Sequence, residues 1–320
     1  MKEICITDIE GIRIGHAQDE KLGTGCTVLI TPDGAPTGVD VRGGGPASRE
    51  TELLNPVSSQ EQIYAVFLSG GSAFGLDATG GVMKYLREKD IGYKTGLGTI
   101  PLVCSSCIFD LVVGSPLAYP SQEMAYQACV DAEKNIAKEG NIGAGQGATV
   151  GKYNKSPDMM KSGIGNYAVQ CGQIKVGALV VVNAIGDVYD KTGKIIAGML
   201  TPDKATFANT EKIMFADCAT VKDFYSENTT LGVVVTNAAF NKVQMTKIAS
   251  MAQNGMARVI SPVHTMADGD TMYATSVGNI TADINAVGTL AAKVVEQAVI
   301  NAVKAAQPIY GLKTASCMAK

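Results

Sequence analysis

A threonine preceded by two acids is the arrangement in this sequence that most directly suggests chemistry. It stands in the run Asp268-Gly269-Asp270-Thr271, after which the sequence becomes apolar and small. A threonine hydroxyl is a weak nucleophile, and the amine of an N-terminal residue can activate it. Thr271 gains such an amine only if the Asp270–Thr271 bond breaks. The chemistry would be an N-to-O acyl shift, in which the hydroxyl attacks the Asp270 carbonyl and water hydrolyses the resulting ester.

The same four residues are also typical of an ordinary turn before a strand. Asp and Gly are favoured in tight turns because Asp bonds its own backbone and Gly accepts unusual dihedral angles. A strained turn could assist the acyl shift. Spacing alone favours the plain turn, so further residues must decide between the two interpretations.

Other catalytic constellations find little support. His16 and His264 are the only histidines, which leaves Ser-His-Asp catalysis poorly supported, and His264 alone is read as structural. The glycine run 143–148 matches G-x-G-x-x-G only loosely and follows a predicted helix, whereas a dinucleotide site needs a preceding strand. Cys104 and Cys107 have C-x-x-C spacing, but a zinc site needs about four ligands. We read them as buried thiols and expect no metal and no cofactor.

Composition excludes several classes of function. The 320 residues include 27 basic and 30 acidic ones, for a net charge of −3. Without a basic cluster or any Trp, and with only 7 Phe, nucleic-acid binding is not expected. No apolar run approaches the roughly 20 residues of a membrane span, and the N-terminus does not resemble a signal peptide. These features predict a cytoplasmic protein with no membrane partner.

Strands and helices are predicted to alternate along the chain. The apolar patterns favour strands at 26–30, 64–68, 176–182 and 232–236, and helices at 76–88, 121–139, 242–256 and 283–306. Residues 100–113 suit either a strand or a buried helix. This order indicates a layered α/β or α+β fold. With no repeat, linker or composition step, residues 1–320 are read as a single domain.

Several motifs together resemble one family. They are Gly25-Cys26-Thr27-Val28, Val41-Arg42-Gly43-Gly44-Gly45-Pro46, the stretch 68–78 (LSGGSAFGLDA), the stretch 143–152 (GAGQGATVGK) and Asp268-Gly269-Asp270-Thr271. Each is weak alone, but together they make the whole chain similar to the DmpA/NylC family. That family contains an L-aminopeptidase/D-esterase, β-peptidyl aminopeptidases and a nylon-oligomer hydrolase.

The resemblance implies a fold, a processing step and three site residues. The fold would be a four-layered αββα sandwich shared with ornithine acetyltransferase. Self-cleavage would give an α chain (1–270) and a β chain (271–320), with Asp270–Thr271 as the scissile bond. Thr271 would be the nucleophile, Lys152 would line the site, and Asn183 would hold the oxyanion or the nucleophile. The family also implies a small peptide or amide substrate, a homo-oligomer and no cofactor.

Other residues have competing interpretations. Lys152 could instead be a surface lysine on a glycine loop, and Asn183 a turn-forming residue. Backbone N–H groups at Gly70, Gly71 and Ser72 could bind an anion of the substrate, although the three residues also suit a plain tight turn.

The sequence departs from the family at two places. Phe109, also assigned to substrate binding, stands where some members have a tyrosine. The segment 307–311 lacks the carboxylate that some members have there. These departures leave open which group orients the Thr271 amine. They also motivate one alternative, an uncleaved, non-enzymatic binding protein. A further alternative is an acyltransferase on the same fold, in which an amine replaces water as the acceptor.

Overall fold

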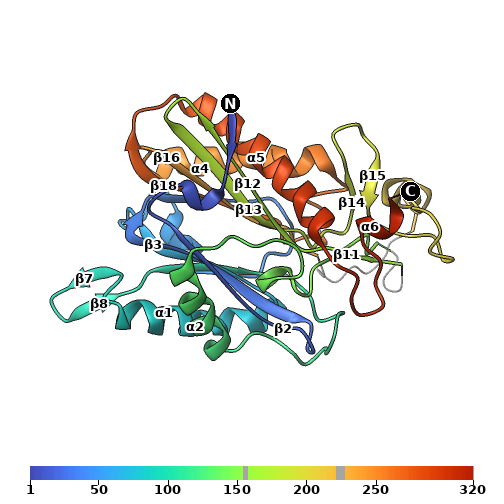
Figure 1. The fold of residues 1–320 in the computed structure, drawn as a ribbon, viewed down its shortest axis with the longest axis horizontal. Helices are drawn as coiled ribbons and strands as arrows, with labels where there is room; N and C mark the ends of the chain where they lie inside the picture. The colour runs from blue at the N-terminus through green and yellow to red at the C-terminus, as the bar shows by residue number, and fades with distance from the viewer. Residues whose placement is uncertain (154–157, 221–227, 320) are drawn as a thin grey trace.

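Two β-sheets lie face to face at the centre of the computed structural model, and helices cover both outer faces (Figure 1). The structure describes residues 1–153, 158–220 and 228–319. One sheet has six strands in the order β1-β12-β13-β16-β18-β4, and the other has five in the order β2-β3-β6-β9-β5. The layers run helix, sheet, sheet, helix. The predicted four-layered αββα sandwich is therefore confirmed.

The six-stranded sheet carries the candidate site. Its strands are β1 (Lys2–Ile4), β12 (Ile164–Cys171), β13 (Ile174–Val181), β16 (Leu231–Ala238), β18 (Thr271–Ile280) and β4 (Thr37–Val41). The pair β16–β18 is parallel and the other pairs are antiparallel. Strands β16 and β18 therefore begin at the edge of the sheet where β13 and β4 end. On the outer face lie α4 (Lys242–Val259) and α5 (Ile284–Ala305).

The five-stranded sheet is covered by the other two long helices. Its strands are β2 (Arg13–Asp19), β3 (Thr24–Ala35), β6 (Ile63–Ser69), β9 (Val103–Cys107) and β5 (Ser48–Arg49). Its outer face packs against α1 (Thr79–Glu88) and α2 (Gln122–Asp131). The segment 100–113, which suited a strand or a helix, contains the strand β9, and this strand pairs in parallel with β6.

Short elements complete the fold. The small strands are β7 (Tyr93–Thr95), β8 (Gly98–Ile100), β10 (Thr149–Val150), β11 (Met160–Lys161), β14 (Asp187–Tyr189), β15 (Ile195–Ala197) and β17 (Ile260–Ser261). The short helices are α3 (Thr210–Ala216) and α6 (Ala315–Met318), with 3-10 turns η1 (Ile6–Asp8), η2 (Thr51–Leu54), η3 (Ser72–Ala78), η4 (Ala132–Lys134) and η5 (Gly143–Gly145). The β7–β8 hairpin projects from the body beside α1 (Figure 1).

Apolar side chains fill all three spaces between the layers. Between the two sheets lie Leu29 and Leu68 from one side and Leu179, Leu231 and Tyr273 from the other, each at most 1% exposed. Separate apolar clusters join each sheet to its helices. Burial of this kind contributes roughly 25 cal/mol for each Å² of apolar surface removed from water. The pairing of the two sheets is thereby fixed, and with it the edge that carries Thr271.

Helix α5 is the longer of the two helices that cover the six-stranded sheet. It begins after Asp283, whose side chain accepts a hydrogen bond from the Ala286 N–H (2.8 Å) and so caps the first turn. The predicted helix 283–306 is confirmed. By length and composition α5 is apolar enough to cross a membrane, in contrast to the sequence expectation of no such segment. Most of its apolar segment is buried inside the protein, and this burial accounts for the apolar composition.

Two predicted helix ends were wrong, and tertiary contacts explain both. Helix α4 runs past Gly255, where a Cβ would lie 2.3 Å from the Ala292 carbonyl of α5. That glycine serves close packing and not helix termination. Helix α2 ends at Asp131, followed by a short 3-10 turn, and does not reach residue 139. Asn135 there adopts a φ of 48°, and its side chain accepts the Ile14 N–H of strand β2 (3.0 Å).

Helix α5 sits so close to the sheet that strand β12 needs a glycine. A Cβ on Gly165 would lie 2.2 Å from the Ala298 carbonyl and 2.3 Å from the Ala302 nitrogen. We expect Gly165→Ala to lower the free energy of unfolding by about 1–3 kcal/mol or more through overpacking. Chemical denaturation measures the change. Gly172 has a positive φ and is therefore unsuitable as a control. Gly96→Ala is the control, because a Cβ there would meet nothing within 4 Å, and its free energy of unfolding should stay near the wild-type value.

Candidate active site

Thr271 is the first residue of β18 and is fully buried. It pairs with Leu231 of β16 on one side and with Val41 of β4 on the other, and Leu231 pairs in turn with Val181 of β13. These four residues form one row at the edge of the sheet where β13 and β4 end. Neighbouring strands are about 4.8 Å apart. Residues that follow β13 are therefore brought close to the proposed nucleophile.

The backbone around Thr271 is fully engaged. Its N–H donates to the Thr230 carbonyl (3.1 Å), and its hydroxyl donates to the Gly269 carbonyl (2.9 Å). The hydroxyl is thus held against the chain that leads to the Asp270–Thr271 bond. The segment is a turn that leads into strand β18, as the plain alternative has it, and it is buried.

Lys152 and Asn183 form a buried pair. The Lys152 ammonium donates to the Asn183 side-chain oxygen (2.7 Å) and to the Asn183 carbonyl (3.2 Å). The Thr149 N–H donates to the same side-chain oxygen (3.1 Å). The Asn183 amide nitrogen donates to the Phe109 carbonyl (3.0 Å), which uses one of its two protons. Lys152 is therefore not a surface lysine, and Asn183 is a buried polar hub.

One short segment links this pair to Thr271. The Thr229 N–H donates to the Asn183 carbonyl (2.9 Å), and the next carbonyl, that of Thr230, accepts the Thr271 N–H. The structure thus gathers Thr271, Lys152 and Asn183 at one edge of one sheet. The Phe109 backbone reaches the same cluster through Asn183. The roles of these residues remain predictions, and the contact that joins Asn183 to the segment beside Thr271 is the hydrogen bond from the Thr229 N–H.

Asp110 is a buried acid that interacts electrostatically with Lys152, and the sequence interpretation missed it. Its carboxylate accepts the Gly71 N–H (2.6 Å) and the Thr24 hydroxyl (2.8 Å). Burial raises its pKa to about 6, against these hydrogen bonds and the charge of Lys152. The sequence signal was an acid three residues after the buried strand β9, next to Phe109. Some family members have a carboxylate downstream of the nucleophile, whereas Asp110 lies upstream of Thr271 in the chain.

The N–H groups of the glycine turn are already used inside the protein. Gly70 donates to the Gly25 carbonyl, Gly71 to Asp110, and Ser72 to the Ile108 carbonyl (2.9 Å). The predicted anion-binding role of Gly70, Gly71 and Ser72 is therefore corrected. The turn holds Asp110 in place, and it leaves none of these three N–H groups for a substrate anion.

A second buried lysine orders the glycine loop that leads to Lys152. Lys161 is fully buried, and its ammonium donates to the carbonyls of Gly145 (2.9 Å), Ala148 (3.1 Å) and Ser162 (2.5 Å). Burial lowers its pKa to about 7. The glycines of 143–151 therefore let the backbone turn around an internal cation. This arrangement is structural and differs from a nucleotide-phosphate loop.

The two acids before Thr271 are buried, and each forms its own set of hydrogen bonds. The Asp270 carboxylate accepts hydrogen bonds from the backbone N–H groups of Thr230 (2.7 Å) and His264 (3.0 Å). The ring nitrogen Nδ1 of His264 lies 2.9 Å from the same carboxylate. Asp268 accepts from the Thr265 hydroxyl (2.6 Å) and N–H (3.1 Å). His264 therefore helps to fix the residue on the acyl side of the proposed scissile bond. From the sequence, His264 could be a loop residue or part of a site, and taken alone it was read as structural.

Asp268 should make stability depend on pH. Burial, with the charge of Asp270 second, raises its pKa to about 7, against about 3.9 in an unfolded chain. The folded state therefore binds this proton more tightly, and the stability it contributes below pH 4 is lost as pH rises to about 7.

The wild-type side chain should make the free energy of unfolding fall between pH 5 and pH 8 as Asp268 ionises. We expect Asp268→Asn to make this fall smaller. Denaturant titrations at the two pH values measure it. Asp33→Asn, at an exposed position, is the matched control and should keep the wild-type slope. All compared chains carry Thr271→Ala, so that processing does not enter the comparison. Equal slopes for both variants would contradict the prediction.

The C-x-x-C pair lies inside strand β9. Cys104 and Cys107 are free, buried thiols, and burial raises the pKa of both well above its usual value. A neutral buried thiol behaves as a small apolar side chain. The interpretation of the pair as structural thiols agrees with this environment.

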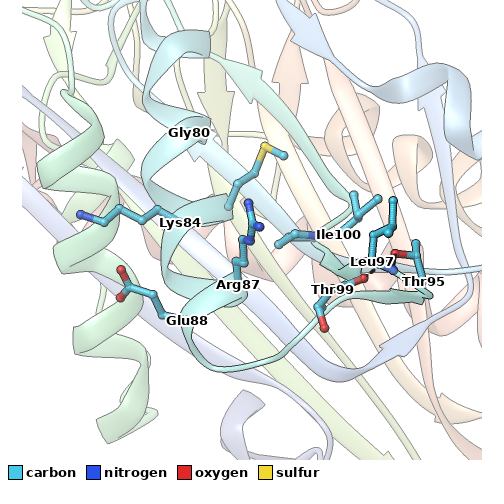
Figure 2. Close-up of a pocket in the computed structure, with 11 residues that line it drawn as sticks. Gly80, Lys84, Arg87, Glu88, Thr95, Leu97, Thr99 and Ile100 are labelled. Carbon is cyan, nitrogen blue, oxygen red and sulfur yellow. Dashed lines mark hydrogen bonds between the residues drawn. The ribbon is translucent and has the colours of Figure 1, made fainter.

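A cleft of about 930 Å³ lies elsewhere, between α1 and the β7–β8 hairpin (Figure 2). Gly80, Lys84 and Arg87 line its helical wall, and Leu97 and Ile100 line its hairpin wall. None of the predicted site residues lines this cleft. It is thus separate from the cluster around Thr271.

Comparison with known proteins identifies the family. The profile of peptidase family S58 matches residues 5–317. An uncharacterized aminopeptidase of Mycobacterium leprae is 37% identical over 342 aligned positions, which cover 97% of this chain and 92% of the relative. A 6-aminohexanoate-oligomer endohydrolase of Kocuria sp. is 30% identical and covers 95% of this chain and 87% of the relative. The resemblance to the DmpA/NylC family is thereby confirmed.

Solved structures support the same fold. A β-aminopeptidase of Burkholderia sp. superposes with a TM-score of 0.70 at 20% identity, covering 96% of this chain and 88% of the other. The L-aminopeptidase D-Ala-esterase/amidase of Ochrobactrum anthropi, described as a variant of the Ntn hydrolase fold, gives 0.71 at 17% identity, covering 97% and 90%. Since the family profile spans nearly the whole chain, this protein belongs to peptidase family S58.

Proposed function

We propose that this peptide- or amide-bond hydrolase cuts itself between Asp270 and Thr271 and then uses Thr271 as an N-terminal nucleophile. Family membership supports a hydrolase. The observation that carries the assignment to Thr271 is its position at the sheet edge, where Thr229 and Thr230 link it to the buried Lys152–Asn183 pair. The products would be an α chain, 1–270, and a β chain, 271–320, that stay associated through the shared sheet.

The self-cleavage step balances with water as the only co-reactant. The Thr271 hydroxyl oxygen bonds to the Asp270 carbonyl carbon, the bond to the Thr271 nitrogen breaks, and the hydroxyl proton ends on that nitrogen. Water then hydrolyses the ester and leaves a carboxylate on Asp270 and an amine on Thr271. The same hydroxyl attacks the substrate afterwards, with the amine as general base.

The sheet supplies a partner that could orient the new amine. The Thr230 carbonyl accepts the Thr271 N–H in the uncut chain (3.1 Å), and an amine at that position keeps a proton to donate. In the proposed mechanism this backbone carbonyl, just before the neighbouring parallel strand, orients the Thr271 amine. It replaces the downstream carboxylate that the segment 307–311 lacks. The lone pair of the amine then remains for the hydroxyl proton.

Lys152 and Asn183 would supply the electrostatics. A buried ammonium lowers the pKa of a nearby amine and stabilises developing negative charge. The second proton of the Asn183 amide, which the Phe109 bond leaves over, is a donor for the substrate oxyanion. This division of roles fits the observed hydrogen bonds of both residues.

The relatives guide the expected substrate. Proteins with aminopeptidase and oligomer-endohydrolase names support small peptides or amides, with a free amine at the acyl side. We further expect a cytoplasmic homo-oligomer that needs no cofactor. Membership of a peptidase family argues against the non-enzymatic alternative.

An assay on small aminoacyl anilides tests the activity. Purified protein should release the aniline and the free amino acid. An added amine acceptor separates hydrolysis from acyl transfer: a hydrolase yields mainly the free acid, whereas dominant acylation of the added amine would favour the transferase. No turnover on any short amide would count against the proposed reaction.

A further inference from the structure

The loop that follows β4 wraps the segment in front of Thr271. It carries Val41-Arg42-Gly43-Gly44-Gly45-Pro46, a motif that none of the residues discussed so far explains. Four consecutive N–H groups, those of residues 42–45, donate to carbonyls within 265–270. Successive N–H groups of a regular strand point to opposite sides and cannot do this. The loop is therefore shaped to present its amides to one short piece of chain.

Two of these amides meet on a single oxygen. The Arg42 N–H donates to the Asp270 carbonyl at 3.0 Å, and the Gly43 N–H donates to the same oxygen at 3.3 Å. A continued β ladder accounts for the first bond but not for the second. The carbonyl that receives both is the one that the Thr271 hydroxyl must attack. Two backbone donors aimed at an oxygen that gains charge are the form of an oxyanion hole.

Glycine is required where the loop touches the scissile segment. A Cβ on Gly43 would lie 2.3 Å from the Asp270 nitrogen and 2.4 Å from the Asp268 carbonyl. Both atoms belong to the backbone and cannot move aside as a side-chain tip would. Residue 43 therefore lacks a side chain because its N–H must come this close to the Asp270 carbonyl.

We propose that the Arg42 and Gly43 N–H groups are the oxyanion hole for self-cleavage, an inference that rests on the proposed function. When the Thr271 oxygen bonds to the Asp270 carbon, the carbonyl oxygen becomes an alkoxide, and the two amides stabilise it. As the bond to the Thr271 nitrogen breaks, the C=O bond reforms within the same pair of donors. These donors are already in place in the uncut chain, so the two amides need no rearrangement before the step.

The test follows self-cleavage in time after cell-free synthesis of labelled full-length chain. Arg42→Pro removes one donor, and Gly43→Ala pushes the other away from the Asp270 carbonyl. The matched control is Gly44→Ala, one residue further on, where the new Cβ would lie 2.7 Å from the Met266 Cα and 2.8 Å from its Sδ, so it disturbs the packing of the loop without meeting the Asp270 segment. Thermal unfolding of each purified chain checks that it folds. Gly43→Ala decides the matter if Arg42→Pro does not fold.

We expect Arg42→Pro and Gly43→Ala each to slow cleavage by about 100- to 1,000-fold, the usual effect of losing one oxyanion donor, and Gly44→Ala to cleave nearly as fast as wild type. A folded Arg42→Pro or Gly43→Ala chain that cleaves at the wild-type rate would overturn the inference and leave the proposed function standing. Equal slowing by Gly44→Ala would also overturn it, because loop packing would then be the cause. A wild-type chain that never cleaves would remove both.

Discussion

Replacing Thr271 with alanine is expected to leave the chain at its full length and without amide hydrolase activity. Alanine removes the hydroxyl oxygen that attacks the Asp270 carbonyl in the proposed step, and without cleavage no amine forms. Loss of a nucleophile typically lowers turnover by on the order of 10⁴-fold or more. The backbone bond from residue 271 to the Thr230 carbonyl does not need the side chain, so the variant should fold. A denaturing gel and a hydrolysis assay measure both effects.

Thr271→Ser is the matched control for this prediction. Serine keeps the hydroxyl and loses only a methyl group, so the variant should cleave and should retain hydrolysis. An alanine variant that is cut at the same bond would show that another group, or a contaminating protease, performs the cleavage. The proposed role of Thr271 would then be wrong.

Replacing Lys152 with methionine is expected to lower kcat/KM by about 100- to 1,000-fold, the range for a lost electrostatic contribution at an oxyanion. Methionine fills similar space but carries no charge, and the Asn183 oxygen keeps its bond from the Thr149 N–H. Lys152 lowers the pKa of the Thr271 amine in the proposed mechanism, since a nearby positive charge disfavours the protonated form. Its loss should therefore shift the acidic limb of the pH–rate profile to higher pH.

Lys21→Met makes the same chemical change at an exposed position and should leave rate and profile unaltered. The pH profile separates an electrostatic role from a structural one, because a lysine that only supports the loop would change the rate without moving the limb. A Lys152→Met enzyme with wild-type kcat/KM would contradict the role assigned to this residue.

The sequence predicted those parts of the site that lie in contiguous motifs. Thr271, Lys152 and Asn183 each end or begin a recognisable stretch, and their roles stay predictions. The sheet brings the stretches of Thr271 and Asn183 to one edge, and a hydrogen bond joins Lys152 to Asn183. Helix α5 was also predictable, because its apolar pattern is long and its cap is local. Asp110 was missed, since its partners Gly71 and Thr24 are 39 and 86 residues away in the chain.

Two of the wrong predictions share one physical cause. Gly255 was read as a helix end because glycine often ends helices, but here it lets α4 approach α5. The turn at residues 70–72 was read as an anion site from its backbone, yet its N–H groups are taken up by distant residues of the chain. In each case a tertiary contact decided the role of a glycine. Local sequence carries the conformational freedom of a glycine but not the neighbour that uses it.

The intact mass of purified wild-type protein tests the central claim most directly. After incubation long enough for slow processing, the account predicts two chains whose masses correspond to 1–270 and 271–320, with Thr271 as the first residue of the smaller one. Sequencing from the new N-terminus identifies that residue. A single mass of the full 320-residue chain, or a cut at any other bond, would contradict the account.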